Sequence, residues 1–146
     1  MSTQNLKNKT VRGYISSRDI GKYYFPQKIQ NLVILDYAGK KKLNLQLSGT
    51  EWIIKDSYLM LKSLIKEKHI DGILFFSIFQ LLDKKNFFEK TVKEIIGMNK
   101  NIFFALEDLK ITNNNDIQKI LEIIKIDQFT SLRDFNNLKK KINKRL

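Results

Sequence analysis

The chain has 146 residues, of which 42% are hydrophobic and none is cysteine. This length and apolar content suit one domain with a continuous core, and the lack of cysteine excludes disulfides, a thiol nucleophile and cysteine-based metal sites. No apolar run reaches the roughly 18 residues that a membrane span requires, and the first ten residues are polar, so we expect a cytoplasmic protein.

The formal net charge of +12 would favour nucleic acid or an anionic membrane as a partner. Most of the cations are lysines, and Ile and Asn are also abundant, as in proteins from AT-rich genomes. The positive excess is densest after Lys125, where a basic helix is more often a solvated face. Codon bias and a functional basic surface both stay open, and nucleic acid is not the expected partner.

The first half of the chain alternates between strand and helix patterns. An apolar run at residues 11–15 ends abruptly in polar side chains and predicts a strand, and a proline then begins a helical pattern over 26–39. Alternation over 43–47 predicts a second strand that ends in a polar loop at 48–51. Residues 52–68 carry the stripe of an amphipathic helix.

The second half repeats this alternation. A nearly continuous apolar run at 70–79 predicts a central strand that is buried on both faces. An amphipathic helix through 87–97 precedes a fourth strand at 101–106 and a short fifth strand at 109–112. Three asparagines then provide the cap of a helix at 116–125.

Strands that alternate with helices, joined by connections too long for hairpins, predict an α/β fold with a parallel sheet covered on both faces. We expect a flexible start at residues 1–9, an α/β domain at 10–126, and a basic amphipathic helix at 127–146. That last helix packs on the domain or makes the protein a homo-oligomer.

The carboxyl ends of parallel strands lie at one edge of a sheet, so polar residues that follow different strands meet there. Arg18 would bind a carboxylate or phosphate, with Ser16 and Ser17 as hydrogen-bonding partners of the same anion. Glu51 and Glu107 are candidate general acids or bases if burial raises their pKa. The other candidate binding residues are Tyr14, Gln27, Ser48, Thr50, Ser77 and Gln80. No metal site is expected, and the pattern indicates no particular cofactor.

Several segments resemble the catalytic domain of serine recombinases of the resolvase and invertase type. They are Gly13-Tyr14, Asp36-Tyr37-Ala38, Ile70 to Leu74, the Leu81 loop and Phe104 to Glu107, and they follow the order of that family over residues 10–112. The resemblance implies a single-domain flavodoxin-like sheet of strand order 2-1-3-4-5.

The recombinase chemistry does not carry over with the fold. The first strand of that family ends in Tyr-x-Arg-Val-Ser, whereas here Ser16 stands at the arginine position and Arg18 at that of the nucleophilic serine. Ser17 is one residue away and is a candidate offset nucleophile. Phe79-Gln80-Leu81 replaces the family's Asp-Arg-Leu, which removes both charged groups that act on the phosphodiester. Strand exchange is not expected.

A second set of segments resembles the sporadic carbohydrate cluster proteins. The set comprises Gly13 to Arg18, Pro26-Gln27 with Gln30-Asn31, Ser48-x-Thr50-Glu51, Ser57 to Leu61, Ile70 to Ile73, Ser77-x-Phe79-Gln80-Leu81 and Glu107-x-Leu109. This resemblance implies a part in the biosynthesis of bacterial surface carbohydrate of the lipopolysaccharide or O-antigen type.

Three functions are consistent with these observations. The main hypothesis is a protein of surface-carbohydrate biosynthesis that binds or transforms a small anionic sugar metabolite at the carboxyl edge, with catalysis left open. The second is a non-catalytic accessory subunit that self-associates through its last helix. The third is a nucleic-acid binder that retains a recombinase-like fold without strand-exchange activity.

Overall fold

The structure is a computed structural model that describes residues 7–54, 56–82, 84, 86–122, 124 and 125. The chain divides into two compact units, Met1–Thr112 and Asn113–Leu146. The boundary predicted between residues 126 and 127, and the terminal helix predicted at 127–146, lie outside the described residues. Within the described residues, no helix has the length and apolar content needed to cross a bilayer.

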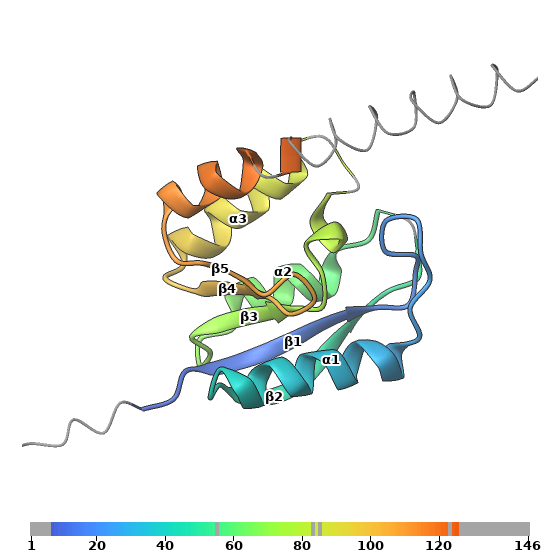
Figure 1. Ribbon diagram of the computed structural model, residues 1–146, viewed down its shortest axis with the longest axis horizontal. Helices are drawn as coiled ribbons and strands as arrows, with labels where there is room; N and C mark the ends of the chain where they lie inside the picture. The colour runs from blue at the N-terminus through green and yellow to red at the C-terminus, as the bar shows by residue number, and fades with distance from the viewer. Residues whose placement is uncertain (1–6, 55, 83, 85, 123, 126–146) are drawn as a thin grey trace, which may run out of the picture. The chain divides into compact units, whose positions relative to one another are not determined.

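The first unit is built on a five-stranded sheet of order β2-β1-β3-β4-β5 (Figure 1). This result confirms the predicted α/β fold class and strand order. The strands are β1 (Thr10–Ser16), β2 (Asn44–Glu51), β3 (Gly72–Phe75), β4 (Asn101–Phe104) and β5 (Leu109–Ile111). The first four are parallel, whereas β5 runs antiparallel to β4. Only a short turn joins β4 to β5, and a parallel crossover needs a longer connection.

Helices cover both faces of the sheet (Figure 1). They are α1 (Gln27–Lys40), α2 (Leu59–Lys66) and α3 (Phe87–Gly97), with a 3-10 helix η1 (Ile78–Leu81) after β3. α1 packs on one face, where Ile34 and Tyr37 share a buried cluster with Leu74 and Phe103. α2 and α3 lie on the opposite face.

Aromatic rings form the core of that opposite face. The Phe75 ring lies 5.3 Å from Tyr14 and 5.4 Å from Phe104, and Phe88 of α3 packs 6.3 Å from Phe104. Phe103 and Phe104 are neighbours in sequence, yet they pack on different faces because side chains alternate along a strand. The central strand β3 is therefore apolar and buried on both faces, as the sequence predicts.

The helix predicted over residues 52–68 begins only at Leu59. Asp56 has a φ of +65°, which a continuous right-handed helix does not accommodate. Ile54, part of the predicted apolar stripe, is 62% exposed in the loop that precedes the helix. The helical spacing of apolar residues therefore continues into a segment that is not a helix.

Two predicted segments at the carboxyl edge also differ in the structure. Residues 48–51 are not a loop but the second half of β2, where Glu51 pairs with Ser16 of β1. The strand predicted over 70–79 ends at Phe75, because Ser77 caps η1 directly afterwards. The Ser77 hydroxyl accepts a hydrogen bond from the Phe79 N–H at 3.2 Å.

The second unit is helical over residues 114–122 and at 124 and 125. The Asn113 Oδ1 accepts a hydrogen bond from the Asp116 N–H at 3.0 Å, which is the N-cap contact that the asparagine run predicts.

Gly72→Ala tests the close approach of β3 to β4. A Cβ at this position would lie 2.7 Å from the Asn101 carbonyl oxygen and 3.2 Å from the Phe103 ring. We expect urea denaturation to show a loss of about 1–3 kcal/mol in the free energy of unfolding. Gly97→Ala is the control, because nothing lies within 4 Å of its Cβ and alanine favours a helix. Equal unfolding free energies for both variants would contradict the packing.

Candidate functional site

Two glutamine side chains fix the end of β1 at the carboxyl edge. The Gln30 Oε1 accepts a hydrogen bond from the Ser16 N–H at 2.9 Å, and its Nε2 donates to the Ser16 carbonyl at 2.8 Å. The Gln80 Nε2 donates to the Tyr14 carbonyl and to the Ser16 Oγ, each at 3.2 Å. Ser16 is 3% exposed, so its hydroxyl belongs to the structure of the edge.

Ser17 lies just beyond the strand and is half-buried. Its Oγ accepts a hydrogen bond from the Gln27 Nε2 at 2.6 Å, so these two predicted site residues are in contact. The amide is a donor and cannot take a proton from the hydroxyl, as activation of a nucleophile requires.

Arg18 turns toward the loop that follows β2. Its guanidinium donates to the carbonyls of Ile54 and Ser57 at 3.1 and 3.0 Å, and it lies 4.7 Å from the centre of the Tyr58 ring. The sequence predicts that the guanidinium N–H groups of Arg18 bind an anionic ligand, but in the structure they bind these carbonyls. In the structure, Arg18 fastens one carboxyl-edge loop to another.

Glu51 is the most enclosed acid of the edge, at 1% exposure. Its carboxylate accepts hydrogen bonds from the Tyr14 hydroxyl at 2.9 Å and from the N–H groups of Trp52, Met60 and Leu61 at 3.1 to 3.2 Å. Two of these N–H groups belong to the first turn of α2, where a negative charge is favourable. Glu51 therefore caps α2 and joins it to β1.

The Tyr14 hydroxyl stays a donor to this carboxylate. Burial raises the pKa of Tyr14 most strongly, and the negative charge and hydrogen bond of Glu51 raise it further. The phenol is thus protonated at neutral pH, which suits a structural hydrogen bond.

Glu107, which follows β4, has a structural role similar to that of Glu51. Its carboxylate accepts hydrogen bonds from the Ser77 Oγ at 2.6 Å and from the Ile78 N–H at 3.1 Å. Gln80 closes the capping box of η1, since its Oε1 accepts from the Ser77 N–H at 3.1 Å. Glu107, Ser77 and Gln80 are thus brought together, as the sequence predicts, in contacts that hold the turn.

Most of the predicted site residues lie at one edge of the sheet, as expected. Their polar groups form hydrogen bonds with one another. Tyr14, Ser16, Ser77 and Gln80 form connected hydrogen bonds, and Glu51 joins them through Tyr14. Ser48 and Thr50 lie within β2 itself. The predicted catalytic roles of Ser17, Glu51 and Glu107 stay predictions, and the geometry supports structural roles for them.

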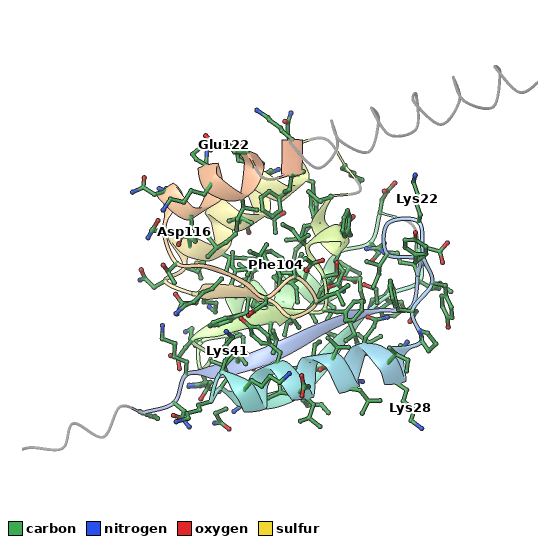
Figure 2. The ribbon with its side chains drawn as sticks, in the orientation of Figure 1. Lys22, Lys28, Lys41, Phe104, Asp116 and Glu122 are labelled. Carbon is green, nitrogen blue, oxygen red and sulfur yellow. The ribbon has the colours of Figure 1, made fainter. Side chains whose placement is uncertain are left out.

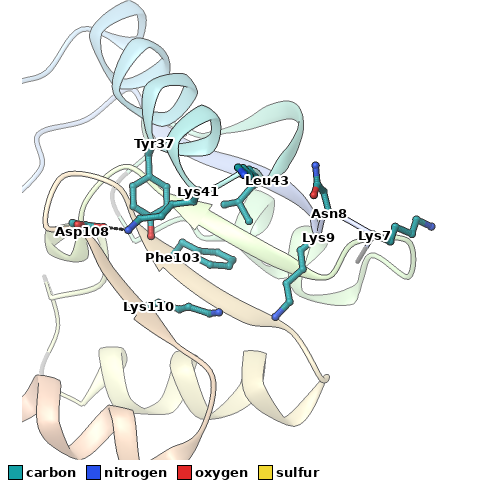
Figure 3. A pocket seen from close by; sticks show the side chains of 10 residues that line it. Lys7, Asn8, Lys9, Tyr37, Lys41, Leu43, Phe103, Asp108 and Lys110 are labelled. Carbon is teal, nitrogen blue, oxygen red and sulfur yellow. Dashed lines mark ion pairs between the residues drawn. The ribbon is translucent and has the colours of Figure 1, made fainter. Parts of the chain in front are cut away.

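A second candidate site lies on the α1 face, near the amino end of β1. A cavity of about 360 Å³ is lined by lysines from three segments, with Tyr37 and Phe103 as buried walls (Figure 3). We call it the lysine cleft, and its lining residues are Lys7, Asn8, Lys9, Tyr37, Lys41, Lys42, Leu43, Phe103, Asp108 and Lys110.

The lysine cleft is strongly positive. Asp108 is the one carboxylate among its lining residues, and its Oδ1 pairs with the Lys41 Nζ at 3.1 Å. The Lys110 Nζ lies 5.6 Å from the centre of the Phe103 ring, where the ring face favours a cation. Lysine ammonium groups act as point charges for phosphate, so this cleft suits an anion.

Sequence reasoning does not find this cleft. The sequence predicts that Lys7 and Lys9 belong to a flexible start, that Lys41 and Lys42 lie between the first helix and the second strand, and that Lys110 lies in a short strand. The available signal is the lysine run after the first helix, but only the fold shows that it faces Lys110. Among the described residues, no group of three or more His, Cys, Asp or Glu side chains could hold a metal ion.

No family model matches the chain, and no curated protein matches it. One similar solved structure is the N-terminal catalytic domain of TP901-1 integrase, with a TM-score of 0.58 and 14% sequence identity. The match covers 84% of this chain and 97% of that one. It shows a shared fold, that of a recombinase catalytic domain, as the resemblance to serine recombinases predicted.

This similarity contradicts the main functional hypothesis, a part in surface-carbohydrate biosynthesis. The resemblance to sporadic carbohydrate cluster proteins gains no support from the comparisons. Its short segments include Ser16, Glu51, Ser77 and Gln80, whose contacts hold the carboxyl edge together. No finding tests the anionic sugar metabolite that was expected as a ligand.

Glu51→Gln tests the structural role of the buried carboxylate. The neutral amide replaces one acceptor oxygen with a donor that faces other donors, so we expect unfolding free energy to fall by about 1–3 kcal/mol in urea denaturation. Glu94→Gln on the exposed side of α3 is the control and should change little. A folded Glu51→Gln protein of unchanged stability would contradict the role of Glu51 as the cap of α2.

Proposed function

We propose that this chain binds the phosphate backbone of a nucleic acid through the lysine cleft and does not exchange strands. The observation that carries the proposal is the gathering of five lysines around one cavity that has a single carboxylate in its lining. Clustered cations displace the counterions of a nucleic acid, and this release favours binding.

The distribution of ion pairs supports the cleft as the binding surface. Lys41 is paired with Asp108, whereas no ion pair is described for Lys9, Lys42 or Lys110. All three of these lysines are exposed, so their charges are available to phosphates. They come from the start of β1, the turn after α1 and β5, so the fold itself brings them to one cavity.

The contacts at the carboxyl edge support binding without strand exchange. In recombinases this edge would carry an arginine where this chain has Ser16, and a serine where it has Arg18. Here the Ser16 hydroxyl accepts a hydrogen bond from Gln80, and Arg18 is bound to backbone carbonyls. Neither group is arranged to attack or to stabilise a phosphodiester. The integrase domain named above shares the fold, and we extend only its association with nucleic acid to this chain.

Fluorescence anisotropy with labelled single-stranded and duplex oligonucleotides tests the proposal across a range of salt concentrations. The variant K9A/K42A/K110A removes three cleft lysines. For duplex DNA we expect the slope of log K against log salt to become shallower by about 0.9 for each phosphate that the variant no longer neutralises. The same variant should bind weakly to all sequences, because lysines that bind phosphate read no sequence information.

The matched control is K62A/K66A/K90A, which removes three exposed lysines of α2 and α3 and so changes the net charge equally. This control should keep the salt slope of the parent chain. Equal losses in the two triple variants would assign binding to net charge and overturn the cleft as the site. Absence of binding by the parent chain at low salt would overturn the proposed function.

A further inference from the structure

Large apolar side chains gather in the loops that follow β1 and β2 and in η1, which follows β3. We call them the loop-tip patch, and they are Tyr23, Tyr24, Trp52, Ile53, Ile54 and Phe79. Each is at least 44% exposed, and Ile53 reaches 72%. Large exposed apolar patches are uncommon on soluble proteins and generally mark an interaction surface.

The loops that carry this patch are fastened to the domain. Besides the bonds from Arg18 to the β2 loop, Lys84 pairs with Asp56 at 3.2 Å. In the β1 loop, the backbones of Ile20 and Tyr23 exchange hydrogen bonds of 2.8 and 3.2 Å. These contacts fix the loops in place, and the apolar side chains on them are exposed in the folded domain.

The loops also contact one another. Phe79 lies beside Gly21, whose φ of +62° lets the β1 loop turn at this point; a Cβ there would be 3.7 Å from the Phe79 ring. Arg18 connects the β1 loop with Ile54. These contacts join the three segments that carry the six side chains.

Positive charges flank the patch. Lys22 is in the β1 loop and Lys28 in the first turn of α1, and both lie at this end of the domain, away from Lys41 (Figure 2). Both are exposed, and no ion pair is described for either. The chain as a whole carries a net charge of +12, so a negative surface is attracted from a distance.

We propose that the loop-tip patch docks on the surface of an anionic lipid bilayer. Tyrosine and tryptophan have an apolar body and a polar end, which suits the boundary between headgroups and acyl chains. The isoleucines between them would enter the apolar layer, while Lys22 and Lys28 meet anionic headgroups. Exposed lysines beside these aromatic and aliphatic side chains complement an anionic bilayer in both charge and polarity.

The intrinsic fluorescence of Trp52 tests the proposal directly, because Trp52 is the only tryptophan of the chain. The probe is a titration with phosphatidylcholine vesicles, with and without phosphatidylglycerol. We expect a blue shift of Trp52 emission with the anionic vesicles, and quenching by brominated acyl chains. The variant I53S/I54S keeps both the charge and the tryptophan, and should partition about tenfold or more weakly.

The control is L47S/M98S, which replaces two exposed apolar side chains away from the patch and should partition like the parent chain. Vesicle binding without a blue shift would show adsorption by charge alone and overturn the proposal. A blue shift that grows with protein concentration in the absence of lipid would assign the patch to protein contacts and also overturn it. I53S/I54S should keep oligonucleotide binding, and K9A/K42A/K110A should keep the blue shift, so the two proposed sites fail independently.

Discussion

Glu51 sits at the end of β2 with its carboxylate away from water, and four donors from β1, the following loop and α2 surround it. A buried charge is very costly unless hydrogen bonds replace those that water made, so these donors and the carboxylate need one another. The contact fixes α2 against the sheet and sets where the chain leaves β2 at Trp52. Arg18 and the outward-facing Trp52 depend on that position.

Charged groups have different partners at the two ends of the domain. At the carboxyl edge, Glu51 and Glu107 accept hydrogen bonds from hydroxyl and backbone donors, so polar groups there are satisfied within the protein. At the lysine cleft, positive charges exceed the negative ones among the lining residues. The groups Ser16, Glu51 and Glu107 are therefore taken up by contacts within the protein and do not form an anion site, whereas the excess of lysines in the cleft attracts an anion.

The alternation of strand and helix patterns predicts the α/β class, and the resemblance to serine recombinases implies the strand order that the structure shows. The sequence also places Ser16, Glu51, Ser77 and Gln80 at one edge, since parallel strands bring their ends together. It does not show that these groups bind one another, because a polar residue looks the same in sequence whether its partner is a ligand or a neighbouring backbone. The start of α2 escapes prediction for a related reason. The apolar spacing of Ile54 and Tyr58 continues across a loop whose conformation is set by tertiary contacts with Arg18.

Backbone amide shifts of the isotope-labelled chain, followed by NMR while a short oligonucleotide is added, test the location of the binding surface most directly. We expect perturbations to concentrate at Lys9, Lys42, Leu43 and Lys110, which line the lysine cleft from separate segments. The carboxyl edge should remain close to its free-state shifts. Perturbations centred instead on residues 16–18 and 77–80 would contradict the account, because they would place the nucleic acid where the structure has already paired its polar groups.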